Sequence, residues 1–227
     1  MKIGKVTGYI ILAATFIFIY GLSLLSFIFS SSEIDVSGFL ILSSLLINMI
    51  VLGGSSILGN MLFYSSNLYM SLKSLYFTKK NIGYSVLIGF VSALSILFFL
   101  GLLFSILIYM GYTPPDNPLS ENIAEILTVP LVIFIPLLSS ISEEIFFRGF
   151  LQPKLIGITT PLIGIVITSA LFGFAHLAYQ NPLQIVIPFF IGIIFGLLLL
   201  KTKNILAPIS AHYFFNFIQL ALTYFSK

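Results

Sequence analysis

The chain has 227 residues, of which 59% are hydrophobic and 7% are charged, and its mean hydropathy is +1.14. A soluble domain carries about 25% charged residues, so this composition excludes a water-soluble globular protein and indicates a membrane protein. The formal net charge is +3 and there is no cysteine, which excludes disulfides, thiolate metal sites and cysteine nucleophiles; no long basic run indicates nucleic-acid binding.

Long apolar runs separated by polar clusters divide the chain into membrane helices of about 20 residues, the length that crosses a bilayer. In chain order we predict seven spans, at residues 6–30, 39–64, 84–110, 129–151, 161–177, 183–200 and 205–225. The first run is too long for the apolar region of a signal peptide, so we expect an uncleaved helix. The predicted fold class is an all-α, polytopic transmembrane helical bundle.

The charged residues of the connections alternate in sign along the chain. Basic residues precede span one and follow spans two, four and six: Lys2, Lys5, Lys73, Lys79, Lys80, Arg148, Lys154, Lys201 and Lys203. The intervening connections carry acidic residues instead: Glu33, Asp35, Asp116, Glu121 and Glu125. Because Lys and Arg favour cytoplasmic loops, the pattern predicts a cytoplasmic N-terminus and an outer C-terminus.

Ionisable residues inside the apolar runs are confined to the second half of the chain. Spans one to three have none within their cores. We therefore divide one membrane domain into an N-terminal part, residues 1–126, and a catalytic helical core, residues 127–227. Within the core, Gly192 and Gly196 are four apart and predict a helix face that another backbone approaches closely.

Two adjacent acids, Glu143 and Glu144, interrupt the fourth apolar run. A charged side chain at the bilayer centre costs about 2.5 to 3.5 kcal/mol on insertion scales, so these acids need a partner or a function. Glu144 and Arg148 are four apart and share a helix face, which favours an ion pair that could simply fix packing. Glu143 then points elsewhere, toward the interior of the bundle.

The only two histidines, His176 and His212, lie in later apolar runs, and Asn216 shares a helix face with His212. Taken singly, His176 could satisfy the last carbonyls of its helix, and His212 with Asn216 could hydrogen-bond between helices. Together with Glu143 they supply what amide hydrolysis requires, namely a carboxylate base, an imidazole for water and donors for an oxyanion. The same carboxylate and two imidazoles could instead bind one zinc ion with a water.

Three short motifs follow one another on successive apolar runs. They are Glu-Glu-Xaa3-Arg at 143–148, Phe-Xaa3-His at 172–176 and His-Xaa3-Asn at 212–216. In these motifs, within about residues 129–219, the chain resembles the CPBP group of intramembrane proteases. That group includes the type II CAAX prenyl endopeptidases and the bacterial bacteriocin-processing or immunity (Abi) proteins.

The resemblance implies a glutamate-dependent endopeptidase of membrane or membrane-associated peptides. In that scheme Glu143 activates the water and His176 binds or orients it. His212 with Asn216 forms the oxyanion site. Three neighbours are implied as structural support: Glu144, Arg148 and Phe172. The scheme requires no metal, and the cofactor stays open, with zinc on Glu143, His176 and His212 as the alternative.

Three functions remain open on the sequence alone. The first is an intramembrane endopeptidase with a water-filled cavity open toward the cytoplasm, in the plasma membrane of a bacterium. Its partners would be lipid and a peptide or membrane-protein substrate, not nucleic acid. The second is a noncatalytic membrane scaffold or bacteriocin-immunity protein. The third is ion or proton transport, for which spans one to three offer no ionisable relay groups.

The depth of the candidate residues places a condition on the fold. At 1.5 Å per residue, Glu143 should lie about 12 Å from the inner end of its span, and His212 at a similar depth. His176 instead comes near the outer end of the fifth span. A tilt of that span, a start below the interface or a shallow reentrant turn would bring the groups level, and the linker at 157–161 is where we expect the adjustment.

Overall fold

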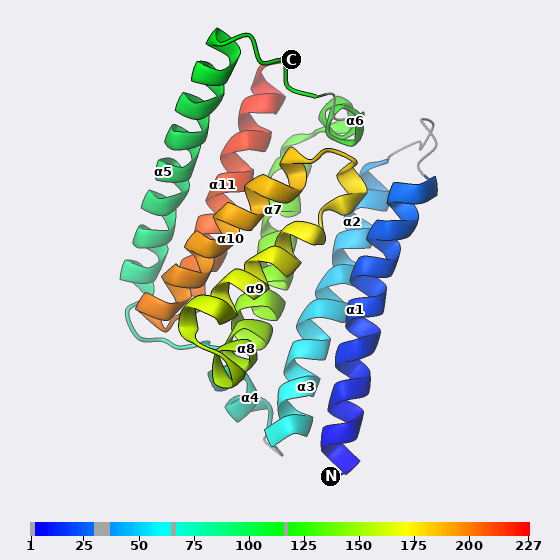
Figure 1. Cartoon of the computed structure of the whole chain (residues 1–227), viewed down its shortest axis with the longest axis vertical. Helices are drawn as coiled ribbons and strands as arrows, with labels where there is room; N and C mark the ends of the chain where they lie inside the picture. Colours follow the sequence, from blue (N-terminus) through cyan, green and yellow to red (C-terminus); the bar gives the residue numbers. More distant parts are fainter. Residues whose placement is uncertain (1–2, 30–36, 65–66, 116–117) are drawn as a thin grey trace.

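The computed structural model of the chain describes residues 3–29, 37–64, 67–115 and 118–227, and within these ranges it is helical without a strand. The all-α prediction is confirmed (Figure 1). The acids Glu33, Asp35 and Asp116 of the predicted outer connections lie outside the described residues. The helices are α1 (Ile3–Phe29), α2 (Gly38–Asn48), π-helical η1 (Met49–Gly53), α3 (Gly54–Tyr64), α4 (Leu68–Ser74), α5 (Ile82–Tyr109), α6 (Pro118–Ile126), α7 (Val129–Glu144), π-helical η2 (Ile145–Leu151), α8 (Gln152–Ile158), α9 (Pro161–Phe174), 3₁₀-helical η3 (Leu177–Tyr179), α10 (Leu183–Thr202) and α11 (Leu206–Phe225).

Six helical stretches of the described chain are long and apolar enough to cross a membrane. They are Ile3–Ile28, Gly38–Tyr64, Ile82–Tyr109, Val129–Ile158, Pro161–Tyr179 and Leu183–Thr202. The seventh predicted span exists as the 20-residue helix α11. It is less apolar than the other six because it carries His212, Asn216 and Gln219. The multi-pass architecture therefore stands, and the least apolar of its seven long helical stretches lies at its centre.

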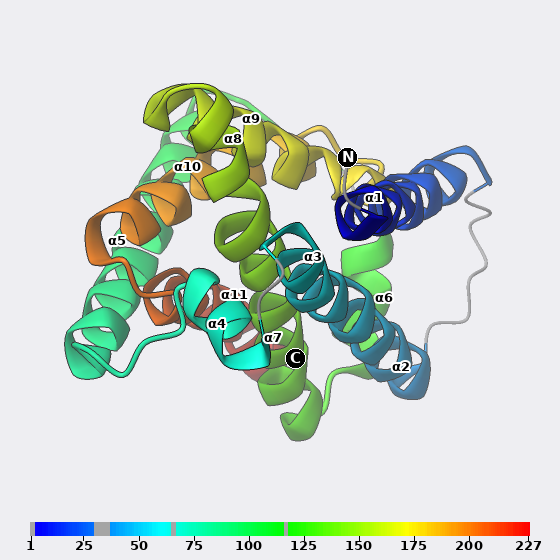
Figure 2. The ribbon, with the colours of Figure 1, turned by 90° about the horizontal axis from the view of Figure 1, so that it is seen from below.

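Helix α11 occupies the middle of the bundle, where it packs against α5, α7 and α10. Helix α7 in turn contacts α2 and η1 on its other side. Seen from below in Figure 2, α7 lies between α11 and the α2–α3 pair. The two helices that carry the acidic pair and His212 are thus neighbours in the interior.

The fifth predicted span is inclined, which is one of the three adjustments that the depth argument allows. Only two residues, Thr159 and Thr160, separate α8 from α9, and the Thr160 hydroxyl caps α9 by accepting from the Ile163 backbone N–H at 3.3 Å. Helix α9 has only 14 residues, and Figure 1 shows it inclined together with α10 across α7. The adjustment therefore lies at the predicted linker, and α9 delivers His176 to the interior of the bundle.

The glycine face of α10 is a close-packing face, as predicted, but it admits side chains rather than a backbone. A Cβ on Gly192 would lie 2.9 Å from Arg148 Nη2, and one on Gly196 would lie 2.8 Å from Gln152 Oε1. The Gln152 amide also donates to the Gly196 carbonyl at 3.1 Å. These two glycines thus make room for the polar side chains that follow the acidic pair.

Candidate active site

The acidic pair stands where α7 changes from α-helix to π-helix. Glu143 and Glu144 are the last residues of α7, and η2 begins at Ile145. Single π-helical turns are rare and occur frequently at functional sites. Across this junction Glu144 Oε2 lies 3.3 Å from Arg148 Nε, and both side chains are fully buried. The ion pair expected from the spacing is present.

The guanidinium of Arg148 lies among aromatic rings. Its central carbon is 4.2 Å from the centroid of the Phe172 ring, with Phe147 at 5.8 Å and Phe195 at 5.7 Å. Aromatic faces attract a cation, which offsets part of the hydration lost on burial. Phe172, expected to pack around the site, therefore lies at its centre.

Glu144 has a second partner that helical spacing did not predict. Its Oε1 lies 2.9 Å from Nδ1 of His212, across the interface between α7 and α11. An ionised carboxylate only accepts hydrogen bonds, so Nδ1 carries the proton and donates to it. Glu144 thereby fixes both the orientation and the tautomer of the imidazole, as a carboxylate does in a catalytic triad.

Glu143 faces the opposite edge of the same imidazole. Its Oε2 lies 4.0 Å from Nε2 of His212, and 23% of its side chain is exposed. That Oε2 is buried without a hydrogen-bond partner among the described residues. A distance of 4.0 Å is too long for a direct hydrogen bond but suits a water that bonds to both groups. Glu143 and Glu144 are adjacent and diverge by about 100° around the helix, but the His212 ring lies close to both carboxylates.

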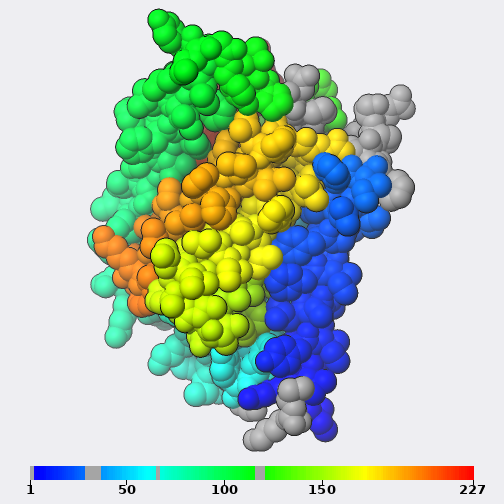
Figure 3. Space-filling model, viewed as in Figure 1, coloured from blue at the N-terminus to red at the C-terminus, as the bar shows by residue number. Residues whose placement is uncertain are grey.

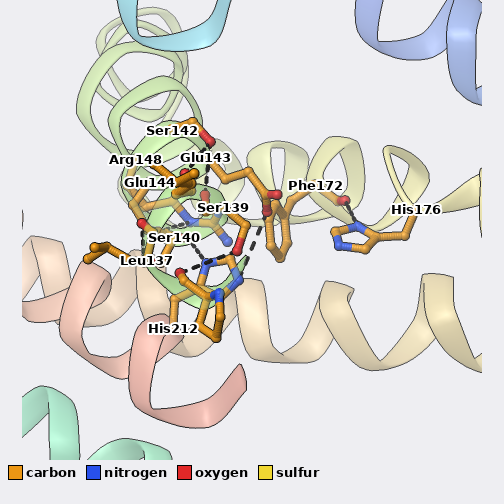
Figure 4. A network of polar contacts seen from close by, with 12 residues as sticks. Leu137, Ser139, Ser140, Ser142, Glu143, Glu144, Arg148, Phe172, His176 and His212 are labelled. Carbon is orange, nitrogen blue, oxygen red and sulfur yellow. Dashed lines mark hydrogen bonds and ion pairs between the residues drawn. The ribbon is translucent and has the colours of Figure 1, made fainter. Parts of the chain in front are cut away.

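His176 is held by the end of its own helix. Its Nδ1 lies 2.9 Å from the Phe172 carbonyl oxygen and donates to it, so Nε2 of the neutral ring can accept a hydrogen bond. The centroid of its ring lies 5.0 Å from that of Phe172 and 6.0 Å from that of Tyr179. The Phe172 and His212 ring centroids are 5.8 Å apart. Figure 4 shows Phe172 between Glu143 and His176. The sequence analysis had not singled out Tyr179.

A cavity of about 600 Å³ adjoins these residues, and its wall includes His176, His212 and Asn216. Glu143 is not one of the wall residues, but its Oε2 lies 4.0 Å from Nε2 of His212, which is. The cavity extends toward Ile123 of α6 and Thr223 of α11. The loop charges place this end of the bundle outside, and the opening toward the cytoplasm stays a prediction.

Residues 125–218 match the family model described as type II CAAX prenyl endopeptidase Rce1-like. The family resemblance is confirmed. The Rce1-like segment contains all three motifs, from Glu143 to Asn216, and the helices that carry them. The match therefore supports a membrane protease of this family type and says nothing about the catalytic mechanism.

Two curated bacterial proteins are similar to the Rce1-like segment. "Uncharacterized protein YpbD" of Bacillus subtilis (strain 168) is 29% identical over 99 residues, which are 43% of this chain and 48% of that protein. "Uncharacterized 24.3 kDa protein" of Escherichia coli is 32% identical over 94 residues, which are 40% of this chain and 42% of that protein. The similarity thus spans less than half the length of these relatives. No solved structure matches the chain.

The three residues named for zinc do not form a preformed cluster here. Within the described parts of the chain, no group of three or more His, Asp or Glu side chains converges as metal ligands. Nδ1 of His176 donates to the Phe172 carbonyl and Nδ1 of His212 donates to Glu144, which leaves Nε2 of both rings free to accept. These orientations suit a shared water and a zinc ion alike, and zinc stays the alternative.

Proposed function

We propose that this chain is a multi-pass intramembrane endopeptidase, a hydrolase in which Glu143 activates water to cut a peptide bond. One observation carries the proposal. Glu143 Oε2 faces His212 Nε2 at 4.0 Å while Glu144 holds the other side of that ring at 2.9 Å. A carboxylate poised beside an oriented imidazole, next to a cavity, is the arrangement that general-base hydrolysis needs.

The reacting water would lie between the two motif helices and α9. The ionised Glu143 accepts a proton from it, while Nε2 of His176 accepts its second hydrogen and aligns it. Glu143 and His212 are near enough to His176 to interact with it electrostatically. The water oxygen then attacks the carbonyl carbon of the scissile bond.

The oxyanion that forms would be stabilised from α11. His212 and Asn216 both line the cavity, one helical turn apart on the same face. When His212 is protonated, Nδ1 donates to Glu144 and Nε2 can donate to the oxyanion, together with the Asn216 amide. The imidazolium and Arg148 also balance the two carboxylates, so the buried cluster has no net charge.

Collapse of the tetrahedral intermediate completes the hydrolysis. The C–N bond breaks, and the proton held by Glu143 passes to the leaving amine. Glu143 returns to its ionised state, the acyl side leaves as a carboxylic acid, and one water has been consumed. The same residue serves first as base and then as acid.

A second hollow beside the cavity supports a substrate that comes from the membrane. A groove of about 510 Å³ between α5 and α10 is lined by apolar side chains except for Ser92 and Ser95. It lies on the face shown in Figure 3, where α5 and α10 are neighbours. Groove and cavity share four wall residues: Leu100, Phe104, Ile187 and Ile191. A membrane-embedded peptide could therefore reach the site from the lipid.

The cellular setting belongs to the same proposal. Both similar proteins are bacterial, and six apolar helices of membrane-crossing length fit a multi-pass protein of a bacterial plasma membrane. We assign catalysis to residues 127–227 and a supporting role to residues 1–126. Peptide precursors or membrane proteins are the substrates expected there.

Replacement of His176 by Ala tests the proposed activity. Wild type and variant are reconstituted in liposomes with a panel of single-span membrane peptides, and new termini are identified by mass spectrometry. Loss of the group that aligns the water should lower cleavage by about 100-fold. Ser105→Ala, an exposed hydroxyl that bonds within α5, is the control and should cleave normally. Cleavage by His176→Ala at the wild-type rate would reject the role of His176, and no cleavage by wild type itself would support the noncatalytic scaffold.

A further inference from the structure

We propose that α1 positions His176, and that Tyr20 and Ser23 are the positioning residues. Both lie outside the Rce1-like segment, which begins at residue 125. The inference rests on the proposed function only in giving His176 a catalytic role. The contacts themselves, between the first helix and the end of α9, are independent of it.

Two hydroxyls of α1 donate to carbonyls next to His176. Tyr20 Oη donates to the Leu171 carbonyl at 2.8 Å, and Ser23 Oγ donates to the Ala175 carbonyl at 2.9 Å. Leu171 lies in the last turn of α9, and Ala175 directly precedes His176. The two bonds therefore hold the backbone segment that leads into His176.

These donors complete the hydrogen bonding of a helix end. The last carbonyls of a helix have no partner within it and need one from elsewhere, above all where water is scarce. The Phe172 carbonyl is satisfied by the His176 ring itself, and the Ala175 carbonyl by Ser23. The Leu171 carbonyl also accepts from the Ala175 backbone N–H at 3.1 Å, so Tyr20 adds a second bond there. Removing Ser23 Oγ leaves the Ala175 carbonyl to compete for the imidazole N–H, and removing Tyr20 Oη loosens the turn that carries it.

The contact face of α1 is narrow and regular. A third bond joins the Gln180 amide to the Phe27 carbonyl at 2.9 Å. Positions 20, 23 and 27 lie on one helix face, whereas Ile17 and Ile28 on other faces are 73% and 60% exposed. In Figure 3 the upper part of α1 lies against the segment that follows α9. Besides its apolar packing against α3, α1 thus makes its polar contacts to the rest of the bundle at this segment.

The test uses the full-length protein in lipid nanodiscs with ¹⁵N-labelled histidine rings. The chain has only two histidines, and the spectrum of His212→Gln assigns the signals of His176. In the double variant Tyr20→Phe with Ser23→Ala, the His176 signals should shift or split between Nδ1- and Nε2-protonated forms. The His212 signals should stay in place, which shows that the protein is folded.

Two matched variants sharpen the result. Thr15→Val removes a buried hydroxyl of α1 that bonds only its own helix, to the Ile11 carbonyl at 2.8 Å, and should leave both rings unchanged. Ser23→Thr keeps the donor and should restore the wild-type spectrum in the Tyr20 wild-type background. Coincidence of the His176 signals of the double variant with those of wild type would overturn the proposal.

Kinetics separate this inference from the proposed function. With a cleaved membrane peptide, the double variant should lower kcat by about tenfold and leave KM unchanged, because a misplaced catalytic group slows the chemical step. If the double variant keeps the wild-type kcat while Glu143→Gln is inactive, positioning by α1 is rejected and the proposed function stands. Full activity of Glu143→Gln would reject the proposed function, and the histidine spectra would still decide the role of Tyr20 and Ser23.

Discussion

Replacement of Glu143 by Gln should abolish most peptide-bond cleavage while the protein stays folded. The amide keeps the size and the polarity of the side chain but cannot take a proton from water. General-base catalysis contributes about 10² to 10⁴ in rate, so kcat should fall by that order with little change in KM. The measurement is the initial cleavage rate of a membrane peptide in liposomes.

The chain supplies a matched control for that experiment. Glu125→Gln makes the same chemical change at an exposed residue of α6, and its cleavage rate should equal that of wild type. Thermal unfolding of both variants in detergent should match wild type as well. A Glu143→Gln protein that cleaves at the wild-type rate would remove Glu143 from the chemistry.

Replacement of Arg148 by Met should cause the largest loss of stability. The change leaves the fully buried Glu144 with His212 as its remaining polar partner, and breaking a buried pair from one side costs about 3 to 5 kcal/mol. The free energy of unfolding in a mixed-micelle titration is the quantity to measure. Lys201→Met, at an exposed position of α10, should change it by less than about 0.5 kcal/mol.

A second substitution distinguishes ion-pair loss from poor packing. Adding Glu144→Leu to Arg148→Met removes the unpaired buried carboxylate, so the double variant should unfold at a higher denaturant concentration than Arg148→Met alone. It should remain inactive, because His212 loses the group that orients it. If the double variant is less stable than the single one, the charge of Glu144 is not the source of the loss.

The spans and the motif positions were predictable because both depend on local sequence. Apolar runs of membrane length predicted all the major helices, since in lipid each backbone must satisfy its own hydrogen bonds. The i,i+4 spacing likewise predicted the Glu144–Arg148 pair. Helix α11 was predicted as a span too, but its hydropathy is lower than that of the other six because it carries the polar residues of the site.

The contacts between helices were not predictable in the same way. Helical spacing implied that Glu143 and Glu144 diverge, and so missed that one imidazole on another helix contacts both of them. The π-helical turn after Glu144 has no pattern in the sequence that we could use. The cavity is lined by residues of several helices, so it depends on tertiary packing that the sequence pattern does not show.

The role of α1 shows the same difference most clearly. Tyr20 and Ser23 are ordinary residues in an apolar run, and no motif marks them. Their importance depends on which carbonyls lie opposite, and those belong to residues about 150 positions away in the chain. The sequence could predict only that a hydroxyl in a membrane helix forms a hydrogen bond, and not with which residue.

The most direct test of the account is whether Glu143 and His212 act on one chemical step. kcat/KM is measured for wild type, Glu143→Gln, His212→Gln and the double variant with the same membrane peptide. If the two side chains share one water and one tetrahedral intermediate, the double variant should be about as slow as the slower single variant. Rate losses that multiply in the double variant would mean that the two residues act independently and would contradict the shared site.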